Sequence, residues 1–300
     1  MREKRINSEK TFHIVAYIIV GVLAIVAFLP FLLIVVASFT EENTLVEYSY
    51  SFFPKAWSLD AYIYLGTQLM TIVKAYGISI FVTGFGTVLS VLLTSMLAYP
   101  LSRKDFVLAN KLTFLIFFTM LFNGGVVPSY IMWTQGFHLS NTVWALIFPN
   151  YLVSAFNVFL ARNYYTMNIP SALIESAQID GATEIRVFVK IILPLSKPVL
   201  ATIGLFTGVL YWNDWTNSIY YINQPQLYSI QYYLMQLMQN IQFLQSGSAG
   251  SNIGAVATMQ MPTTSIRMAL AVIGVVPILI IFPFIQKHLV KGVVMGAVKG

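Results

Sequence analysis

Six apolar stretches dominate this chain, and each is about as long as a membrane-spanning helix. A helix needs roughly 17–25 mainly apolar residues to cross the hydrocarbon core of a bilayer. The stretches cover residues 14–39, 76–100, 112–129, 141–161, 199–221 and 266–286. Only 9% of the residues are charged, against about 25% in a soluble domain, and the mean hydropathy is +0.74. The sequence therefore predicts an all-α membrane protein with six transmembrane helices.

Lysine and arginine are distributed unequally between the two sides that six spans would define. Fourteen lie on the side of the termini: Arg2, Lys4, Arg5, Lys10, Arg103, Lys104, Lys111, Arg162, Arg186, Lys190, Lys197, Lys287, Lys291 and Lys299. Three lie on the other side: Lys55, Lys74 and Arg267. Because basic loops are enriched in the cytoplasm, both termini are predicted to be cytoplasmic. The formal net charge of +6 then needs no nucleic-acid partner.

The first apolar stretch follows several basic residues, as the hydrophobic part of a signal peptide does. At residues 14–39 it exceeds the roughly 7–15 apolar residues of a cleavable signal, so we expect a retained anchor. The chain contains no cysteine, which excludes disulfides and thiolate metal ligands.

The predicted spans assign sides to the connecting segments. Residues 40–75 and 222–265 are the long external segments, and 101–111 and 162–198 are cytoplasmic loops. Within the second external segment, residues 226–244 form an amphipathic pattern typical of one helix, followed by a Gly/Ser-rich link. This helix either packs on the outer rim of the bundle or contacts an external partner.

The long cytoplasmic loop has local signals for two short helices separated by a turn. Pro170 suits a first helical turn, and residues 171–179 favour a helix. Asp180-Gly181 then predicts a break, because glycine adopts the left-handed geometry of a helix cap. A second helix follows with Glu184 in its first turn and ends at Pro194. Its predicted apolar face comprises Ile185, Phe188, Val189 and Ile192.

The same loop resembles the EAA signature of bacterial ABC-importer permeases, which reads Glu-x-Ala, three residues, Gly, nine residues, Ile-x-Leu-Pro. The residues at those positions are Glu175, Ala177, Gly181, Ile191, Leu193 and Pro194. Asp180 and Ala182 flank the glycine, and Ser176 is the one departure, standing where the signature's name has alanine. The resemblance implies that these residues couple the channel to a separate ATPase. The alternative is an ordinary amphipathic loop lying on the membrane.

The resemblance covers nearly the whole chain, residues 1–300, as a single permease domain with the coupling loop at 162–198. Further similarities are Asn123-Gly124-Gly125, Trp212-Asn213-Asp214-Trp215 and the tail at 287–300. They resemble the maltose-type second subunits of carbohydrate importers, above all the oligosaccharide and polysaccharide (LplC-like) branch. In such subunits the tail reaches the ATPase dimer; a lipid-facing terminus is the alternative.

Membership of that family would imply an ATP-driven importer in the bacterial cytoplasmic membrane. The partners implied are a second permease subunit, two ATPase subunits and an extracellular solute-binding protein that delivers an oligosaccharide. ATP and Mg would be bound by the ATPase subunits, with no cofactor on this chain. In agreement, the chain has no Gly-Lys dipeptide, which a phosphate-binding loop requires.

Polar residues inside the predicted spans are candidates for the substrate pathway, because polar groups in a membrane usually face a bundle interior or a cavity. One set repeats along a single face of the second span: Ser79, Thr83, Thr87, Ser90 and Thr94. The pathway candidates from the fourth and fifth spans are Asn150, Asn157, Tyr211, Trp212, Asn213, Asp214 and Trp215. Hydroxyl stripes and the Gly204-x-x-x-Gly208 pair also suit helix packing, and the tryptophans suit an aromatic belt at the interface.

Two other functions remain open from the sequence. One is an ABC permease for a non-sugar solute; the other is a membrane-embedded transferase acting on lipid-linked glycan. The three histidines are His13, His138 and His288, and they fall in different loops or termini. No metal-ligand spacing and no Ser/His/Asp set on one side of the membrane can be assembled from the sequence. We therefore predict no catalytic residue and no metal site.

Overall fold

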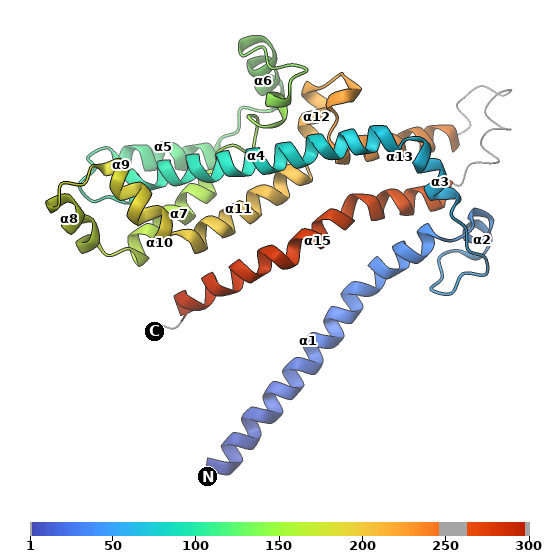
Figure 1. Ribbon diagram of the computed structural model, residues 1–300, viewed down its shortest axis with the longest axis horizontal. Helices are drawn as coiled ribbons and strands as arrows, with labels where there is room; N and C mark the ends of the chain where they lie inside the picture. The colour runs from blue at the N-terminus through green and yellow to red at the C-terminus, as the bar shows by residue number, and fades with distance from the viewer. Residues whose placement is uncertain (1, 246–262, 298–300) are drawn as a thin grey trace. The chain divides into compact units, whose positions relative to one another are not determined.

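The computed structural model describes residues 2–245 and 263–297, and these are almost entirely helical (Figure 1). The described part contains no strand, only one antiparallel bridge between Thr40 and Trp57. In chain order the helices are α1 (Arg2–Ser38), α2 (Glu42–Tyr48), α3 (Asp60–Thr67), α4 (Leu69–Ser102), α5 (Ala109–Leu121), α6 (Val126–Ile131), η1 (Met132–Gly136), η2 (Val143–Leu146), α7 (Ala155–Asn168), α8 (Ser171–Ile179), α9 (Glu184–Val187), η3 (Phe188–Ile192), α10 (Leu193–Leu195), α11 (Lys197–Trp212), α12 (Thr216–Tyr221), η4 (Pro225–Leu227), α13 (Ile230–Gln245) and α15 (Thr263–Ala297). The predicted all-α class is confirmed.

Three helical segments are long and apolar enough to cross a membrane: Phe12–Ser38, Leu69–Ser102 and Thr263–Ile280. Two bent pairs also qualify when each is counted as one span, which makes up to five within the described residues. The amphipathic helix predicted at 226–244 is present as α13, while the Gly/Ser-rich link after it lies outside the described residues. In the tail, α15 continues as helix through Ala297.

Two predicted spans are interrupted rather than continuous. The stretch at 112–129 breaks after α5, where Gly125 has φ +88°, and α5 and the following α6–η1 segment meet at 114°. That positive φ favours glycine, so the Asn123-Gly124-Gly125 sequence accounts for the break. In the stretch at 199–221, α11 ends at Trp212 and the chain becomes helical again at Thr216. Before this stretch, the helical segment 184–195 meets α11 at 79°.

The continuous span predicted at 141–161 is wrong. Only η2 and the first half of α7 are helical there, and an irregular segment separates them. Pro149 disfavours helix in the residue before it, and Asn150 has φ +67°, a left-handed conformation. Apolar composition alone cannot distinguish a helix from a buried irregular segment. Helix α7 then extends beyond the predicted end, to Asn168.

The chain divides into two compact units, Met1–Leu69 with Leu237–Pro277, and Met70–Gln236 with Ile278–Gly300. In the first unit, Glu42 at the start of α2 caps the N-terminus of α15. Its carboxylate accepts hydrogen bonds from the backbone N–H groups of Thr264 and Ser265, at 2.7 and 2.8 Å, and from the hydroxyls of Thr263 and Ser265. These bonds satisfy donors that a helix N-terminus leaves without an internal partner.

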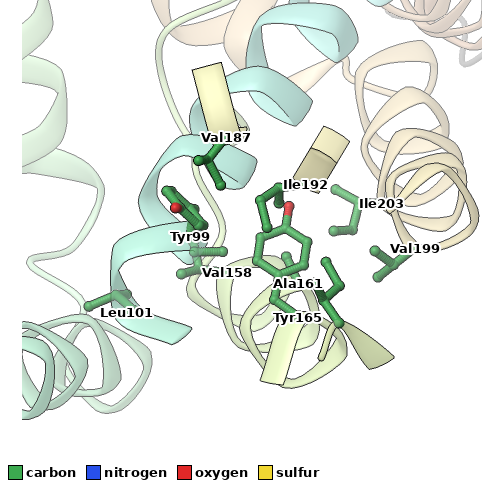
Figure 2. Packing of buried hydrophobic residues seen from close by; sticks show 11 residues of the cluster. Tyr99, Leu101, Val158, Ala161, Tyr165, Val187, Ile192, Val199 and Ile203 are labelled. Atoms are coloured by element: carbon green, nitrogen blue, oxygen red, sulfur yellow. The ribbon is translucent and has the colours of Figure 1, made fainter. Parts of the chain in front are cut away.

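The core of the second unit lies where α4, α7 and α11 meet the cytoplasmic loop predicted from the sequence. Figure 2 shows this cluster, which combines Tyr99 of α4, Tyr165 of α7 and Ile203 of α11 with Val187 and Ile192 from the loop. Figure 1 shows α8, α9 and α10 gathered at one end of α4. The loop is therefore seated on the helices and does not extend freely.

Glycines allow α4 and α11 to approach closely. A Cβ atom added to Gly86 would lie 2.7 Å from the ring of Tyr211, so only glycine fits there. A Cβ atom added to Gly204 would lie 3.6 Å from the side chain of Val91. One added to Gly208 would lie 3.3 Å from the side chain of Thr87. The Gly204-x-x-x-Gly208 pair thus serves helix packing in this structure.

Candidate functional site

The loop at 162–198 forms the helix–Gly–helix structure that its sequence predicts. Helix α8 follows Pro170 and ends at Asp180, and Gly181 has φ +77°. Thr183 caps α9, its hydroxyl accepting a hydrogen bond from the backbone N–H of Arg186 at 3.4 Å. Glu184 lies in the first turn of α9, as predicted. The turn is thus specified by local signals.

The signature residues divide into an inward and an outward group. Ala177, Ala182 and Ile191 pack against the buried cluster shown in Figure 2. Glu175, Asp180, Gly181 and Pro194 are exposed, and Leu193 is half-buried. The inward group seats the loop on α4, α7 and α11, which leaves the outward group accessible to another protein.

The predicted apolar face of the second helix is partly wrong. Val187 and Ile192 are buried, whereas Ile185 is 77% exposed and Val189 is 51% exposed. Residues 188–192 form a π-helical turn, η3, which changes the angular spacing on which the predicted face depended.

Two isoleucines near the turn are exposed; Ile179 was not singled out in the sequence, and Ile185 was predicted on the apolar face. Ile179 is 87% exposed and Ile185 is 77% exposed, on either side of Gly181. Large apolar side chains that are exposed close together in the chain are typical of a surface that another protein covers. The sequence signal for this exposed surface was the predicted helix break at Asp180-Gly181, which Ile179 directly precedes.

A second polar region is buried around Asp214, which is 5% exposed. Its Oδ1 accepts hydrogen bonds from the backbone N–H groups of Thr216 and Asn217, at 3.0 and 3.2 Å, and from the Tyr151 hydroxyl at 3.4 Å. Two of these donors are the first N–H groups of α12, so Asp214 caps that helix.

Neighbouring side chains extend this cluster. Asn150 donates to Asn217 Oδ1 at 2.8 Å, and the Tyr211 hydroxyl donates to the carbonyl of Ile147 at 2.7 Å. Ser229 donates from its hydroxyl to the Asp214 carbonyl at 3.0 Å. We call Asn150, Tyr151, Tyr211, Asp214, Asn217 and Ser229 the Asp214 cluster. Asn217 was missed in the sequence, although it is a polar residue within the predicted span at 199–221.

The structure brings together only some of the predicted pathway residues. Asn150, Tyr211 and Asp214 belong to the Asp214 cluster, whereas Asn157 donates to Thr207 at 3.3 Å. Asn213 donates to the carbonyl of Val209. Trp212 is 4% exposed with its ring 6.3 Å from that of Tyr76, while Trp215 is 46% exposed.

The polar face of α4 divides in the same way. Ser79 accepts from the backbone N–H of Ile230, and Ser90 donates to the carbonyl of Tyr151. Within the described residues, the buried hydroxyls of Thr83, Thr87 and Thr94 have no hydrogen-bond partner. Thr87 lies against Gly208 of α11, so part of this face serves packing.

No protein-family model matches the chain. Comparisons with individual proteins and with solved structures, however, agree on one family. The chain is 38% identical over 292 residues to the polygalacturonan/rhamnogalacturonan transport system permease YtcP of Bacillus subtilis, covering 97% of this chain and 99% of that one. It is also 38% identical to Protein LplC of Bacillus subtilis, covering 98% and 97%. The chain belongs to the carbohydrate ABC transporter permeases. The family predicted from the EAA signature is thereby confirmed.

A solved structure supports the same assignment for this permease. A bacterial ABC transporter involved in the import of the acidic polysaccharide alginate matches with a TM-score of 0.76 and 26% identity, covering 93% of this chain and 97% of that chain. The family consists of transport proteins, which argues against the glycan-lipid transferase. Among the described residues of this multi-pass permease, no group of three or more His, Asp or Glu side chains could hold a metal ion.

Proposed function

We propose that this permease is one of two different membrane subunits of an ATP-driven importer for an oligosaccharide. An extracellular binding protein delivers the sugar, and two ATPase subunits bind ATP and Mg, so no cofactor is needed on this chain. The observation that carries the proposal is the helix–Gly–helix loop, with its exposed Glu175, Gly181, Ile179 and Ile185. Closure of the ATPase pair pushes on this loop and opens the sugar pathway outward.

Six membrane passages remain our proposal for the topology of the bacterial plasma-membrane protein. The three long helices and two bent pairs supply five, and the irregular segment with α7 would supply the sixth. The unequal distribution of basic residues supports cytoplasmic termini and a cytoplasmic coupling loop. Family likeness supports contact between the tail at 287–300 and the ATPase dimer.

The absence of cysteine makes the topology directly testable. We would introduce single cysteines at exposed Glu47 on α2 and exposed Lys190 in the cytoplasmic loop. A membrane-impermeant maleimide should label Glu47→Cys in intact cells and Lys190→Cys only after permeabilisation. The reverse pattern would overturn the orientation.

The substrate class is tested with the reconstituted complex. The permease, its paired subunits and the binding protein in proteoliposomes should import oligosaccharides in an ATP-dependent manner. A panel should compare uronic-acid oligomers with neutral oligosaccharides, because the relatives include permeases named for polygalacturonan, arabinooligosaccharides and raffinose. Uptake of amino acids or peptides, and of no glycan, would support the non-sugar alternative.

A further inference from the structure

The carboxylate of Glu184 joins the cytoplasmic loop to the end of α4. Its Oε2 accepts a hydrogen bond from the Tyr99 hydroxyl of α4 at 2.5 Å. Its Oε1 accepts one from the side-chain amide of Gln178 in α8 at 2.7 Å, and lies 3.7 Å from Nη2 of Arg103. One side chain thus connects α8, α9, α4 and the turn after α4.

The groups that surround Glu184 are themselves held in place. Arg103 donates from Nε and Nη2 to the two carboxylate oxygens of Asp105, at 2.8 and 2.6 Å. These hydrogen bonds raise the pKa of Arg103 and lower the pKa of Asp105 to about 2, so both remain charged at neutral pH. Tyr99 is fixed by the buried cluster of Figure 2 and by the ring of Phe188, whose centroid lies 5.6 Å away.

We propose that Glu184 is the positioning residue that transmits movement of the coupling helix α8 to the membrane helix α4. The inference rests on the proposed function, since it assumes that an ATPase moves α8. Apolar packing of Ile174 and Ala177 on the core is non-directional, whereas a charge-assisted hydrogen bond has a fixed geometry. Displacement of Gln178 therefore pulls on Glu184, and Glu184 pulls on Tyr99.

The path continues within α4 toward the polar region of the membrane domain. Thirteen positions before Tyr99 on the same helix, Gly86 lies against the Tyr211 ring of α11. A Cβ atom would not fit at this contact, so the backbone of α4 lies directly against the Tyr211 ring, and we expect a shift of α4 to displace that ring. Tyr211 contacts the rest of the Asp214 cluster through the ring of Tyr151, whose centroid lies 5.5 Å from its own. The junction at Glu184 thus reaches the candidate pathway through one rigid helix.

A purely structural role for Glu184 is disfavoured by its exposure. Its side chain is 56% exposed, and ion pairs in such positions contribute little to stability. The eleven buried residues of the cluster in Figure 2 hold the loop on the helices without it. The outward residues Glu175, Ile179 and Ile185 that would meet the ATPase make no contact with this carboxylate in the described interactions. Loss of Glu184 should therefore leave folding and ATPase docking intact.

The experiment uses the full transporter complex in proteoliposomes and compares Glu184→Ala, Tyr99→Phe and the double variant. ATPase binding should be unchanged, while sugar molecules imported per ATP hydrolysed should fall roughly tenfold for Glu184→Ala, as expected for losing a hydrogen bond to a charged group. The double variant should be no worse than the worse single variant, because both remove one interaction. Glu184→Gln keeps an acceptor for Tyr99 and should retain coupling within about threefold.

Two control variants and the wild-type complex separate the possible outcomes. Glu47→Ala removes an exposed carboxylate from α2, and Tyr164→Phe removes a hydroxyl that donates to the Leu195 carbonyl at 3.3 Å. Both variants should couple normally. Wild-type import per ATP from Glu184→Ala and Tyr99→Phe would overturn the inference, as would additive losses or a parallel loss of ATPase binding. If the wild-type complex itself shows no ATP-dependent import, the proposed function fails instead.

Discussion

The proposed coupling loop at 162–198 and the Asp214 cluster are both polar, but they use their polar groups differently. In the loop, Glu175, Asp180 and Gly181 are exposed and no partner inside the chain occupies the outward face in the described contacts. In the cluster, one oxygen of Asp214 accepts three hydrogen bonds from its own chain. The exposed set is therefore available to another protein, while the buried set chiefly joins segments of this one.

The difference matters for interpreting a carboxylate in a membrane protein. An ionisable residue within a membrane is a candidate functional group by default. Asp214 satisfies the burial expectation, yet its bonds are those of a helix cap. A sugar that bound Asp214 would have to replace these donors or use the other oxygen.

The largest effect is expected from Gly181→Val in the coupling loop. A Cβ atom there has no neighbour within 4 Å, so the change acts only through the backbone, whose φ is +77°. A β-branched residue in this conformation is strained by roughly 1–3 kcal/mol, so the turn should change shape. Sugar uptake and sugar-stimulated ATP hydrolysis should fall together by about tenfold or more, measured in proteoliposomes.

Gly181→Asn is the matched control, because asparagine tolerates left-handed geometry better than valine. It should retain most of the uptake, and affinity of the binding protein for sugar should be unchanged in both variants. Normal coupled transport by Gly181→Val would remove the loop from the coupling role.

The next largest effect, a loss of stability, is expected from Gly86→Ala on α4. The new Cβ atom would lie 2.7 Å from the Tyr211 ring, which is 2% exposed. Overpacking of this kind costs about 1–3 kcal/mol. The thermal unfolding midpoint of the purified complex should fall, whereas Gly84→Ala, with no atom within 4 Å, should behave as wild type. Equal stability of both variants would show that α4 and α11 are less tightly packed in the membrane.

A smaller effect distinguishes the two roles considered for Asp214. Asp214→Ala removes the cap of α12 and should lower stability by about 0.5–2 kcal/mol. Asp214→Asn keeps a capping oxygen, so stability and assembly should be close to wild type. If the carboxylate also binds sugar, Asp214→Asn should weaken uptake of preferred glycans while basal ATP hydrolysis persists. Normal uptake of every glycan by this variant would assign Asp214 to structure alone.

The smallest effect concerns the cap of α15 by Glu42, a carboxylate from 221 positions earlier in the chain. Burial by itself would raise the pKa of Glu42, but hydrogen bonds from Ser265 and Thr264 outweigh it and lower the pKa below 4.5. The stabilisation is therefore present above the unfolded-state pKa and is lost as pH falls through the lower folded-state value. Glu42→Gln should reduce stability by about 1 kcal/mol near neutral pH and flatten its dependence on pH below 4.5.

That dependence is measured by thermal unfolding of the purified complex across an acidic pH series. Glu47→Gln, an exposed carboxylate on the same helix, is the matched control and should follow the wild-type curve. Identical curves for Glu42→Gln and wild type would show that the cap contributes nothing measurable.

The coupling loop was predictable from the sequence because its structure depends on neighbouring residues. Pro170 begins α8, Gly181 provides the left-handed turn and Thr183 caps α9, and each acts within a few positions of itself. The break at Gly125 is also local, because its positive φ suits the glycine-rich sequence Asn123-Gly124-Gly125. The family followed from the same local residues, at fixed spacing.

The tertiary structure alone decided what was buried and what was paired. Apolar composition predicted a helix over 141–161, but a buried irregular segment around Pro149 has the same hydropathy and obtains its hydrogen bonds from α12 and α11. Likewise, Tyr99 and Glu184 are 85 positions apart, and no local pattern relates them. Local backbone preferences act over one or two helical turns, whereas the pairing of distant polar groups depends on how the helices pack.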